Sequence, residues 1–345
     1  MQTCARCKRE LPDDYRVCPF DAHPLGAAED VEPAAPLFAK RYEILRMLGE
    51  GGTARVYKAL DVRSGRNVAL KVIEGPAAKT ATWAERLLRE VELLKSIRHP
   101  NVVEVLDGGR RDDGTPYLVM EYLEGETLGQ LMKRAPMLPI DTALLIAAEI
   151  ASGLAASHAR GVIHRDVKPD NIFLIEDGAR VRRAKVFDYG FARLQGGEGL
   201  TAKGFIVGTP EYMAPEQTLH DPTGHRTDIY GLGVVMYRMI TGVLPFEGDA
   251  PSQLAQHLFV APRAPSLLRV GVTKGVDAIV MTAMRKLPRN RYPSMQDFFE
   301  DVERAMGKRD GQPQTMLEWE DVYEPQTPFA RAIADKLKTR VPEIP

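Results

Sequence analysis

The chain has 345 residues, of which 44% are hydrophobic and 27% are charged, and this composition is typical of a globular protein with one large domain or two. A formal net charge of −1 gives no overall attraction to nucleic acid or to anionic membranes, and no apolar run reaches 18 residues. We therefore expect no nucleic-acid partner and no membrane segment in this chain. The opening residues, MQTCARCKRE, lack the apolar core of a signal peptide, which favours a cytoplasmic location.

All three cysteines lie in the first 18 residues, as Cys4, Cys7 and Cys18. A Cys-x2-Cys pair followed by Cys18-x2-Asp21 has the spacing of two zinc knuckles, so residues 1–25 are predicted to form a zinc-ribbon-like module. The fourth ligand is either Asp21, which has the matching spacing, or His23, the more usual zinc ligand. So short a segment needs the metal to fold. The alternative is a tail that carries free thiols.

The rest of the chain divides into three zones. Residues 26–39 are rich in Ala, Pro and acidic residues and suit a linker, residues 40–307 carry dense apolar periodicity, and residues 308–345 form a polar tail. Within that tail, FARAIADKLKT is compatible with a short amphipathic helix.

The periodic zone begins with strands and continues with helices. Alternation broken by glycine turns predicts three antiparallel strands over 42–73, a helix over 83–97 and further strands over 101–122. Four longer helical patterns follow, at 140–160, 227–241, 274–286 and 294–306. The predicted fold is α+β, with a small β-rich lobe before a larger helical lobe.

A glycine-rich hairpin is predicted in LGEGGTARVYKAL, which contains Gly49, Gly51 and Gly52. The residues after these glycines alternate like a strand, whereas a dinucleotide-binding fingerprint opens a helix. The lysine of a phosphate-binding loop is also missing. Such a hairpin can offer backbone N–H groups to phosphates, although a plain turn is the alternative.

A lysine and a glutamate in the small lobe are predicted to pair. Lys71 lies inside the apolar strand NVALKVI, where a lysine either faces solvent or has an anionic partner. On the helix predicted over 83–97, one apolar face is formed by Trp83, Leu87, Val91 and Leu94. Glu90 lies on or beside this face and therefore needs a cation, for which Lys71 is the best candidate.

Polar residues are concentrated in VIHRDVKPDNIFLI, between two apolar flanks. Asp166, Lys168 and Asn171 lie there on a loop, because a proline interrupts them. Asp188 ends another apolar strand, AKVF, and is followed by a turn glycine. Carboxylate and amide oxygens suit a hard cation such as magnesium. A set of Asx turns would explain one of these residues but poorly explains all of them.

Six motifs in this order resemble the protein kinase family over residues 42–306: GEGGTARV, VALK, HRDVKPDN, DYG, APE and TDIYGLG. The chain looks like the bacterial Ser/Thr kinases of the eukaryotic type. The resemblance implies a bilobal kinase fold, ATP with magnesium or manganese as cofactors, and protein Ser/Thr hydroxyls as acceptors. An ATP-binding pseudokinase scaffold and a kinase of small molecules are the alternatives; the APE segment favours a protein acceptor.

The resemblance also implies roles for individual residues. Asp166 would orient the acceptor hydroxyl, Lys168 would add positive charge beside it, and Asn171 and Asp188 would hold magnesium. Lys71, paired with Glu90, would contact the α- and β-phosphates. The nucleotide-contacting residues would be Gly49, Glu50, Gly51, Gly52, Val56, Ala69, Lys71, Met120, Glu121 and Leu123.

Structural and regulatory roles follow from the same resemblance. Glu216 would pair with Arg291, and Asp228 would brace the catalytic loop. Ala54 replaces a glycine, and Tyr189 replaces the usual Phe, so its hydroxyl needs a partner if it is buried.

The Arg165–Asp166 pair is typical of kinases controlled by phosphate on the activation loop, and Arg193 could supply a second cation. We predict Thr201 as the autophosphorylation site, with a dimer as the arrangement for phosphorylation in trans; a threonine in a flexible loop is the alternative.

Overall fold

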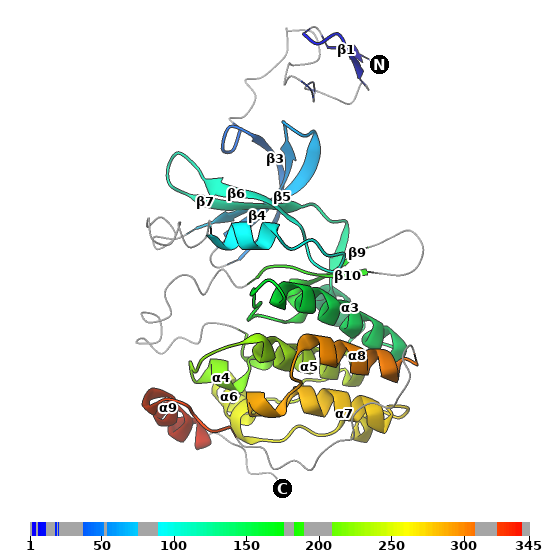
Figure 1. Ribbon diagram of the computed structural model, residues 1–345, viewed down its shortest axis with the longest axis vertical. Coiled ribbons are helices and arrows are strands. Elements are labelled where there is room, and N and C mark those ends of the chain that lie inside the picture. The colour runs from blue at the N-terminus through cyan, green and yellow to red at the C-terminus, as the bar shows by residue number, and fades with distance from the viewer. Residues whose placement is uncertain are drawn as a thin grey trace. The chain divides into compact units, whose positions relative to one another are not determined.

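The computed structural model describes residues 2–4, 6–11, 18, 20, 37–51, 54–74, 89–175, 183–189, 209–307 and 323–339. The chain divides into two compact units, one of Met1–Ser96 with Glu104–Leu123 and the other of Ile97–Val103 with Glu124–Pro345 (Figure 1). The first unit contains a five-stranded sheet and the second is mostly helical. The expected β-rich lobe and larger helical lobe are confirmed.

The sheet of the first unit is antiparallel throughout, with the strand order β3-β4-β5-β7-β6. The strands are β3 (Tyr42–Glu50), β4 (Ala54–Asp61), β5 (Arg66–Ile73), β6 (Val105–Arg110) and β7 (Pro116–Glu121). The three strands predicted over 42–73 and the return to strands over 101–122 are therefore confirmed.

The two faces of this sheet differ in character because side chains alternate along a strand. One face forms an apolar core with the segment before β3, made of Phe38, Tyr42, Ala59, Val68, Leu70, Val72 and Val119. The opposite face carries the residues that alternate with these along the strands, including Val56, Ala69 and Lys71. Because of this alternation, the second face is available for polar contacts.

A helix is present at residues 89–95, within the range predicted over 83–97. Val91 and Leu94 on it are 1% and 4% exposed, so they lie on the buried side as expected. Trp83 and Leu87 lie outside the described residues. Val91 packs against the sheet at Gly108, where an added Cβ would come within 3.0 Å of both Val91 methyl groups.

The second unit combines helices with a small sheet ordered β10-β9-β8. Its helices are α2 (Leu128–Arg134), α3 (Ile140–His158), α4 (Pro215–Thr218), α5 (His225–Thr241), α6 (Ala250–Phe259), α7 (Lys274–Ala283), α8 (Met295–Ala305) and α9 (Pro328–Lys338). Its strands are β8 (Gly125–Thr127), β9 (Ile172–Ile175) and β10 (Arg183–Val186). The four longer predicted helices and the short C-terminal helix are all present.

Three helices of this unit, α2, α4 and α6, were not predicted from the sequence. All three are short, and the caps of α2 and α6 identify these two better than their periodicity does. Thr127 and Gln130 form a reciprocal capping box at the start of α2. The Asp249 carboxylate accepts a hydrogen bond of 3.0 Å from the Ser252 N–H at the start of α6.

Within the described residues, one helix, α3, is long and apolar enough to cross a membrane, and 56% of that stretch is buried inside the protein. It packs against α5, α8 and β10, with Ala147, Ile150, Ala151 and Leu154 almost wholly enclosed. These contacts explain its apolar character as that of a core helix.

Candidate active site

The loop before β9 brings together the three polar residues that the sequence singled out. The Lys168 ammonium nitrogen lies 2.7 Å from Oδ2 of Asp166. The Asn171 Nδ2 donates to the same carboxylate oxygen at 2.9 Å and to the Asp166 backbone carbonyl at 2.8 Å. Asp166 keeps 35% of its side chain exposed, so it is held by two partners yet open to a bound molecule.

A buried carboxylate braces this loop from α5, as predicted for Asp228. It accepts backbone hydrogen bonds from His164 at 2.8 Å and from Arg165 at 2.7 Å, and it contacts Nε2 of His158 at 2.7 Å. Burial alone would raise the pKa of Asp228, but the hydrogen bond with His158 and the other polar neighbours outweigh it, so the pKa lies below its usual range. The brace holds Arg165 at φ +64°, a conformation that non-glycine residues rarely adopt.

Asp188 follows β10 and is tied to the same loop through its neighbour Phe187. The Phe187 N–H donates to the Asn171 carbonyl at 3.1 Å, and Nε2 of His164 lies 2.9 Å from the Phe187 carbonyl. Asp188 itself has φ +60°, so its strained backbone is fixed by these neighbours. Because the Asn171 amide nitrogen is engaged by Asp166, its oxygen and the Asp188 carboxylate offer the oxygen ligands that magnesium prefers.

Tyr189 replaces the usual Phe, and its hydroxyl has a hydrogen-bonding partner. The side chain is buried, and its hydroxyl lies 2.5 Å from Oγ of Ser157 on α3. Burial raises the pKa of Tyr189 above its ordinary range, so the group stays neutral. The extra hydroxyl is therefore accommodated without an unsatisfied polar atom, as the sequence argument requires.

The segment from Thr209 to α4 contacts the catalytic loop at two points. The Lys168 ammonium donates to Oγ1 of Thr209 at 3.1 Å. The Gln217 side-chain amide donates to the Arg165 carbonyl at 2.8 Å. Gln217 was missed in the sequence, although it directly follows the APE motif. Thr201 and Arg193 lie outside the described residues.

The predicted pair of Glu216 and Arg291 is present and almost wholly buried. Two N–H groups of the guanidinium donate to the two carboxylate oxygens, each at 2.8 Å. Burial alone would raise the pKa of Glu216, but Arg291 outweighs burial and lowers it below the usual range. This pair fixes α4, which carries the Gln217 contact.

In the first unit, the glycine-rich stretch forms the predicted hairpin between β3 and β4. Gly49 pairs with Val56, and the Gly51 N–H closes the turn on the Ala54 carbonyl at 2.8 Å. The Glu50 carboxylate is bonded to Nε of Arg55 at 2.9 Å. Gly52 lies outside the described residues.

Strand register places several predicted nucleotide contacts on one face of the sheet. Val56 is opposite Lys71, and Ala69 is opposite Met120. Directly opposed residues share a face, as do residues two apart on one strand. The pairing continues from Lys71 through Leu118 to Gly108, against which the helix of residues 89–95 packs. That helix thus covers the face that carries Lys71, while the contact between Lys71 and Glu90 stays a prediction.

The end of β7 is fixed by hydrogen bonds to the segment before β6. The Glu121 N–H donates to the Glu104 carbonyl at 3.0 Å, and the Glu104 N–H donates to the Glu121 carboxylate at 2.8 Å. Met120 is 8% exposed, and Leu123 is half-buried. These residues form an ordered edge suited to the predicted contact with the adenine ring.

The N-terminal cysteines lie close together without a disulfide. The three Sγ atoms are all within 4.8 Å of one another, and those of Cys7 and Cys18 are 3.4 Å apart. Tetrahedral zinc with Zn–S bonds of about 2.3 Å places sulfur atoms about 3.8 Å apart, so the cluster fits such a site. Burial raises the pKa of the Cys4 thiol, but hydrogen bonds from Cys7 and Arg6 outweigh it, so the pKa is lowered. Asp21 and His23 lie outside the described residues.

The turn between the first two cysteines has the local form of a metal knuckle. The Cys7 N–H points at the Cys4 sulfur, 3.5 Å away, and the Lys8 N–H donates to the Cys4 carbonyl at 2.9 Å. Lys8 adopts φ +61°, and a two-stranded ribbon of β1 (Gln2–Thr3) and β2 (Glu10–Leu11) carries the turn. The ribbon thus presents two thiols toward Cys18.

A β-rich unit with a glycine hairpin, together with a helical unit that holds the Asp166 cluster, defines a protein kinase fold. The model of the protein kinase domain family matches residues 42–300, and the chain belongs to this family. It is 36% identical over 269 residues to a probable serine/threonine-protein kinase of Clostridium perfringens and 37% identical over 272 residues to the serine/threonine-protein kinase PknB of Mycobacterium tuberculosis. These matches cover 78% and 77% of this chain but 38% and 43% of the relatives, so the chain spans less than half of their length.

A likeness in structure agrees with these matches. The crystal structure of the Mycobacterium tuberculosis PknI kinase domain superimposes with a TM-score of 0.63 at 27% identity, covering 79% of this chain and 98% of that one. The bilobal kinase fold expected from the sequence is therefore confirmed. The zinc-ribbon part of that expectation stays a prediction.

Proposed function

We propose that this chain transfers the γ-phosphoryl group of ATP to Ser or Thr hydroxyls of proteins, with magnesium or manganese as the metal. The observation that carries the proposal is the Asp166 cluster, in which a partly exposed carboxylate contacts Lys168 and Asn171 while Lys168 also contacts Thr209. Phosphoryl transfer depends on positioning and charge neutralisation, and this cluster provides both. The named kinases among the relatives support the same activity.

The residues divide the work between them. Asp166 accepts the proton of the acceptor hydroxyl. The hydroxyl oxygen forms a bond to the γ-phosphorus, and the bond from that phosphorus to the leaving ADP oxygen breaks. Lys168 neutralises charge near the transferred group, and the Lys71 face of the sheet holds the nucleotide phosphates. Asn171 and Asp188 would hold magnesium, which would further neutralise the phosphate charges.

A transfer assay tests this proposal against a pseudokinase scaffold. The chain is incubated with labelled Mg·ATP and a generic protein acceptor, and the products are mapped by mass spectrometry. We expect phosphate on Ser and Thr of the acceptor. ATP binding without any transfer would favour the scaffold, and transfer to small hydroxyl compounds alone would favour the small-molecule kinase.

We also propose that Thr201 is the main autophosphorylation site and that two copies meet during its modification. Thr201→Ala is expected to remove most label from the loop and to lower the rate of acceptor phosphorylation by about tenfold or more, because the phosphate brings charge that Arg165 can bind. The rate of autophosphorylation should rise with the square of protein concentration. Full activity of Thr201→Ala, with no phosphate on the loop, would contradict the proposal.

For the N-terminal module we propose zinc binding by Cys4, Cys7 and Cys18, with Asp21 or His23 as fourth ligand. The purified full chain is expected to carry one zinc per chain and to protect its thiols from alkylation until a chelator is added. Cys18→Ser should lose the metal, and comparison of Asp21→Ala with His23→Ala identifies the fourth ligand. Thiols that react equally fast with and without chelator, in a chain that holds no zinc, would contradict it.

The remaining organisation is proposed on the same basis. Residues 1–25 form the metal-binding module, 26–39 the linker, 40–307 the kinase domain and 308–345 the tail. The balanced net charge supports protein substrates in place of nucleic acid, and we place the reaction in the cytoplasm.

A further inference from the structure

The last described helix, α9, packs on the second unit through a narrow apolar seam. Ala330 and Ala334 are 0% and 2% exposed, whereas Ala332 on the opposite side faces solvent. The seam joins one core cluster whose other buried members are Leu219, Leu258, Leu287 and Tyr323. Figure 1 shows α9 beside α4 and α6, and α9 contacts α6 directly. Residues 323–339, named the C-terminal clamp below, are therefore part of this unit's core.

Tyr323 anchors the clamp to a buried carboxylate. Its hydroxyl donates to Oδ2 of Asp221 at 2.9 Å, and the Gln326 N–H donates to the same oxygen at 2.9 Å. Tyr323 and Asp221 are each 4% exposed, and no described residue bonds to the other Asp221 oxygen. Burial and the carboxylate raise the pKa of Tyr323, so its hydroxyl stays a neutral donor. Among the described residues, both hydrogen bonds to this buried carboxylate therefore come from the clamp, which makes its docking specific.

Asp221 connects the clamp to the catalytic loop through α4. Its N–H donates to the Glu216 carbonyl at 2.8 Å and closes the end of that helix. One residue further along α4, the Gln217 side chain donates to the Arg165 carbonyl beside Asp166. Leu219, just after α4, is fully buried in the seam. The short helix is therefore held by the catalytic loop on one side and by the clamp on the other.

We propose that the C-terminal clamp positions residues 209–221 for phosphate transfer and that Tyr323 is its positioning residue. The inference rests on the proposed function, because a protein acceptor must be presented to Asp166 beside Thr209. A small displacement of a segment that aligns reactants can slow a reaction strongly. Loss of the clamp should therefore impair use of the protein acceptor while nucleotide binding, which depends on the first unit, is retained.

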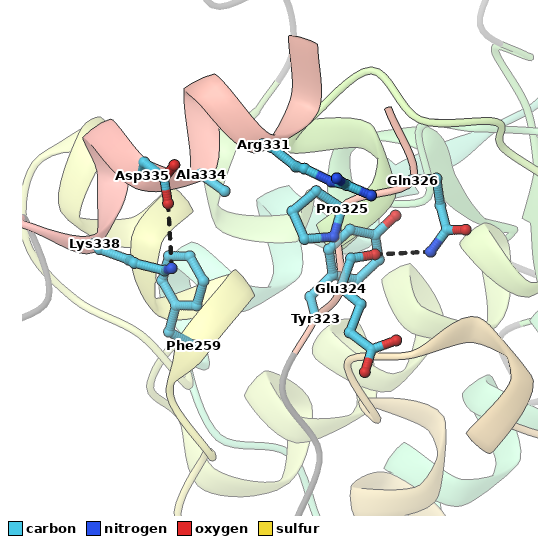
Figure 2. Close-up of a pocket in the computed structure, with 9 residues that line it drawn as sticks. All are labelled: Phe259, Tyr323, Glu324, Pro325, Gln326, Arg331, Ala334, Asp335 and Lys338. Carbon is cyan, nitrogen blue, oxygen red and sulfur yellow. Dashed lines mark hydrogen bonds and ion pairs between the residues drawn. The ribbon is translucent and has the colours of Figure 1, made fainter. Parts of the chain in front are cut away.

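The polar side of α9 is only loosely packed. Figure 2 shows a pocket lined by Phe259, Tyr323 and Pro325, together with the α9 residues Arg331, Asp335 and Lys338. Its volume is about 590 Å³. Asp335 and Lys338 pair with each other across one turn of the helix, at 3.2 Å. The seam and the Tyr323 anchor therefore carry most of the attachment, and one substitution in the seam is expected to release the helix.

Two matched variants of the full chain test the clamp. Ala334→Glu places a carboxylate in the buried seam, whereas Ala332→Glu makes the same change on the exposed side of the same helix. Tyr323→Phe, a milder variant, removes only the donor to Asp221. Amide hydrogen exchange measures the order of residues 209–221 and 323–339. Steady-state kinetics give kcat and separate KM values for ATP and for a protein acceptor.

We expect Ala334→Glu and Tyr323→Phe to speed exchange in both segments. They should lower kcat/KM for the protein acceptor by about 2- to 30-fold, the usual range for coupling between distant residues. The KM for ATP should stay within about twofold, and Ala332→Glu should match the parent chain in every readout. If α9 is released in Ala334→Glu while exchange at 209–221 and acceptor kinetics stay those of Ala332→Glu, the clamp is passive and the inference is wrong. Faster exchange at 209–221 with no transfer by any variant would uphold the clamp and overturn the proposed kinase activity.

Discussion

Asp166→Asn is expected to slow phosphate transfer by a factor of about 10² to 10⁴, the usual contribution of a positioned general base. The amide keeps the shape of the carboxylate, and the backbone carbonyl of residue 166 still accepts from Asn171. What is lost is the negative charge that faces Lys168 at 2.7 Å and the ability to take the acceptor proton. Transfer is measured with labelled Mg·ATP, and nucleotide binding is measured separately by titration calorimetry.

The control for this variant is Asp112→Asn, which makes the same change at an exposed turn where Asp112 forms an exposed ion pair with Lys40. We expect its transfer rate to equal that of the parent chain, because exposed ion pairs contribute little. ATP affinity should be unchanged in both variants, since the nucleotide contacts lie on other residues. A transfer rate of Asp166→Asn within tenfold of the parent would remove Asp166 from the role proposed here.

Much of the catalytic loop could be predicted because its polar residues lie close together in the sequence. Asp166, Lys168 and Asn171 lie within six consecutive positions, so a turn-forming proline was enough to bring them together. The sheet of the first unit was also predictable, because alternation and glycine turns determine strands and hairpins over short distances. The sequence also predicts that a buried Tyr189 hydroxyl needs a hydrogen-bonding partner. It does not identify Ser157 as that partner.

The sequence pattern does not identify which residues contact each other when they are far apart in the chain. Tyr323 and Asp221 are 102 positions apart. An isolated aromatic in the polar tail indicates that the tail packs back on the kinase domain, but it does not identify Asp221 as the partner. α9 packs against this cluster through Ala330, Ile333, Ala334 and Leu337. Their helical spacing predicts an amphipathic helix, but it does not identify the surface that the helix meets. The Gln217 amide donates to a backbone carbonyl 52 positions away. Because every residue has a backbone carbonyl, the sequence does not identify this acceptor. The Glu216–Arg291 pair, 75 positions apart, was predicted only through family resemblance.

Arg291→Met is expected to lower the free energy of unfolding by about 3 to 5 kcal/mol, because it leaves a buried carboxylate without its cation. Every N–H group of the guanidinium has a partner: two donate to Glu216, and the others donate to backbone carbonyls of Arg285, Arg226 and Lys286 at 2.7–2.9 Å. Methionine fills a similar volume but satisfies none of these acceptors. Chemical denaturation at pH 7 measures the loss, and Arg289→Met, at a 64% exposed side chain two positions earlier, should change stability by less than about 1 kcal/mol.

The pH dependence of unfolding separates loss of the ion pair from loss of packing. In the parent chain the pKa of Glu216 is lowered on folding, so its contribution is fully present above the unfolded-state pKa of about 4.3 and is lost as the pH falls toward the lower folded-state value. Without Arg291, burial is the dominant influence and raises that pKa, so the protonated side chain becomes the favoured form. The stability difference between parent and Arg291→Met should therefore be largest near pH 7 and should shrink as the pH falls below about 5. A difference that stays constant from pH 7 to pH 4 would mean that Arg291 acts through packing and its backbone hydrogen bonds, and that the charge of Glu216 contributes nothing to holding α4 in place.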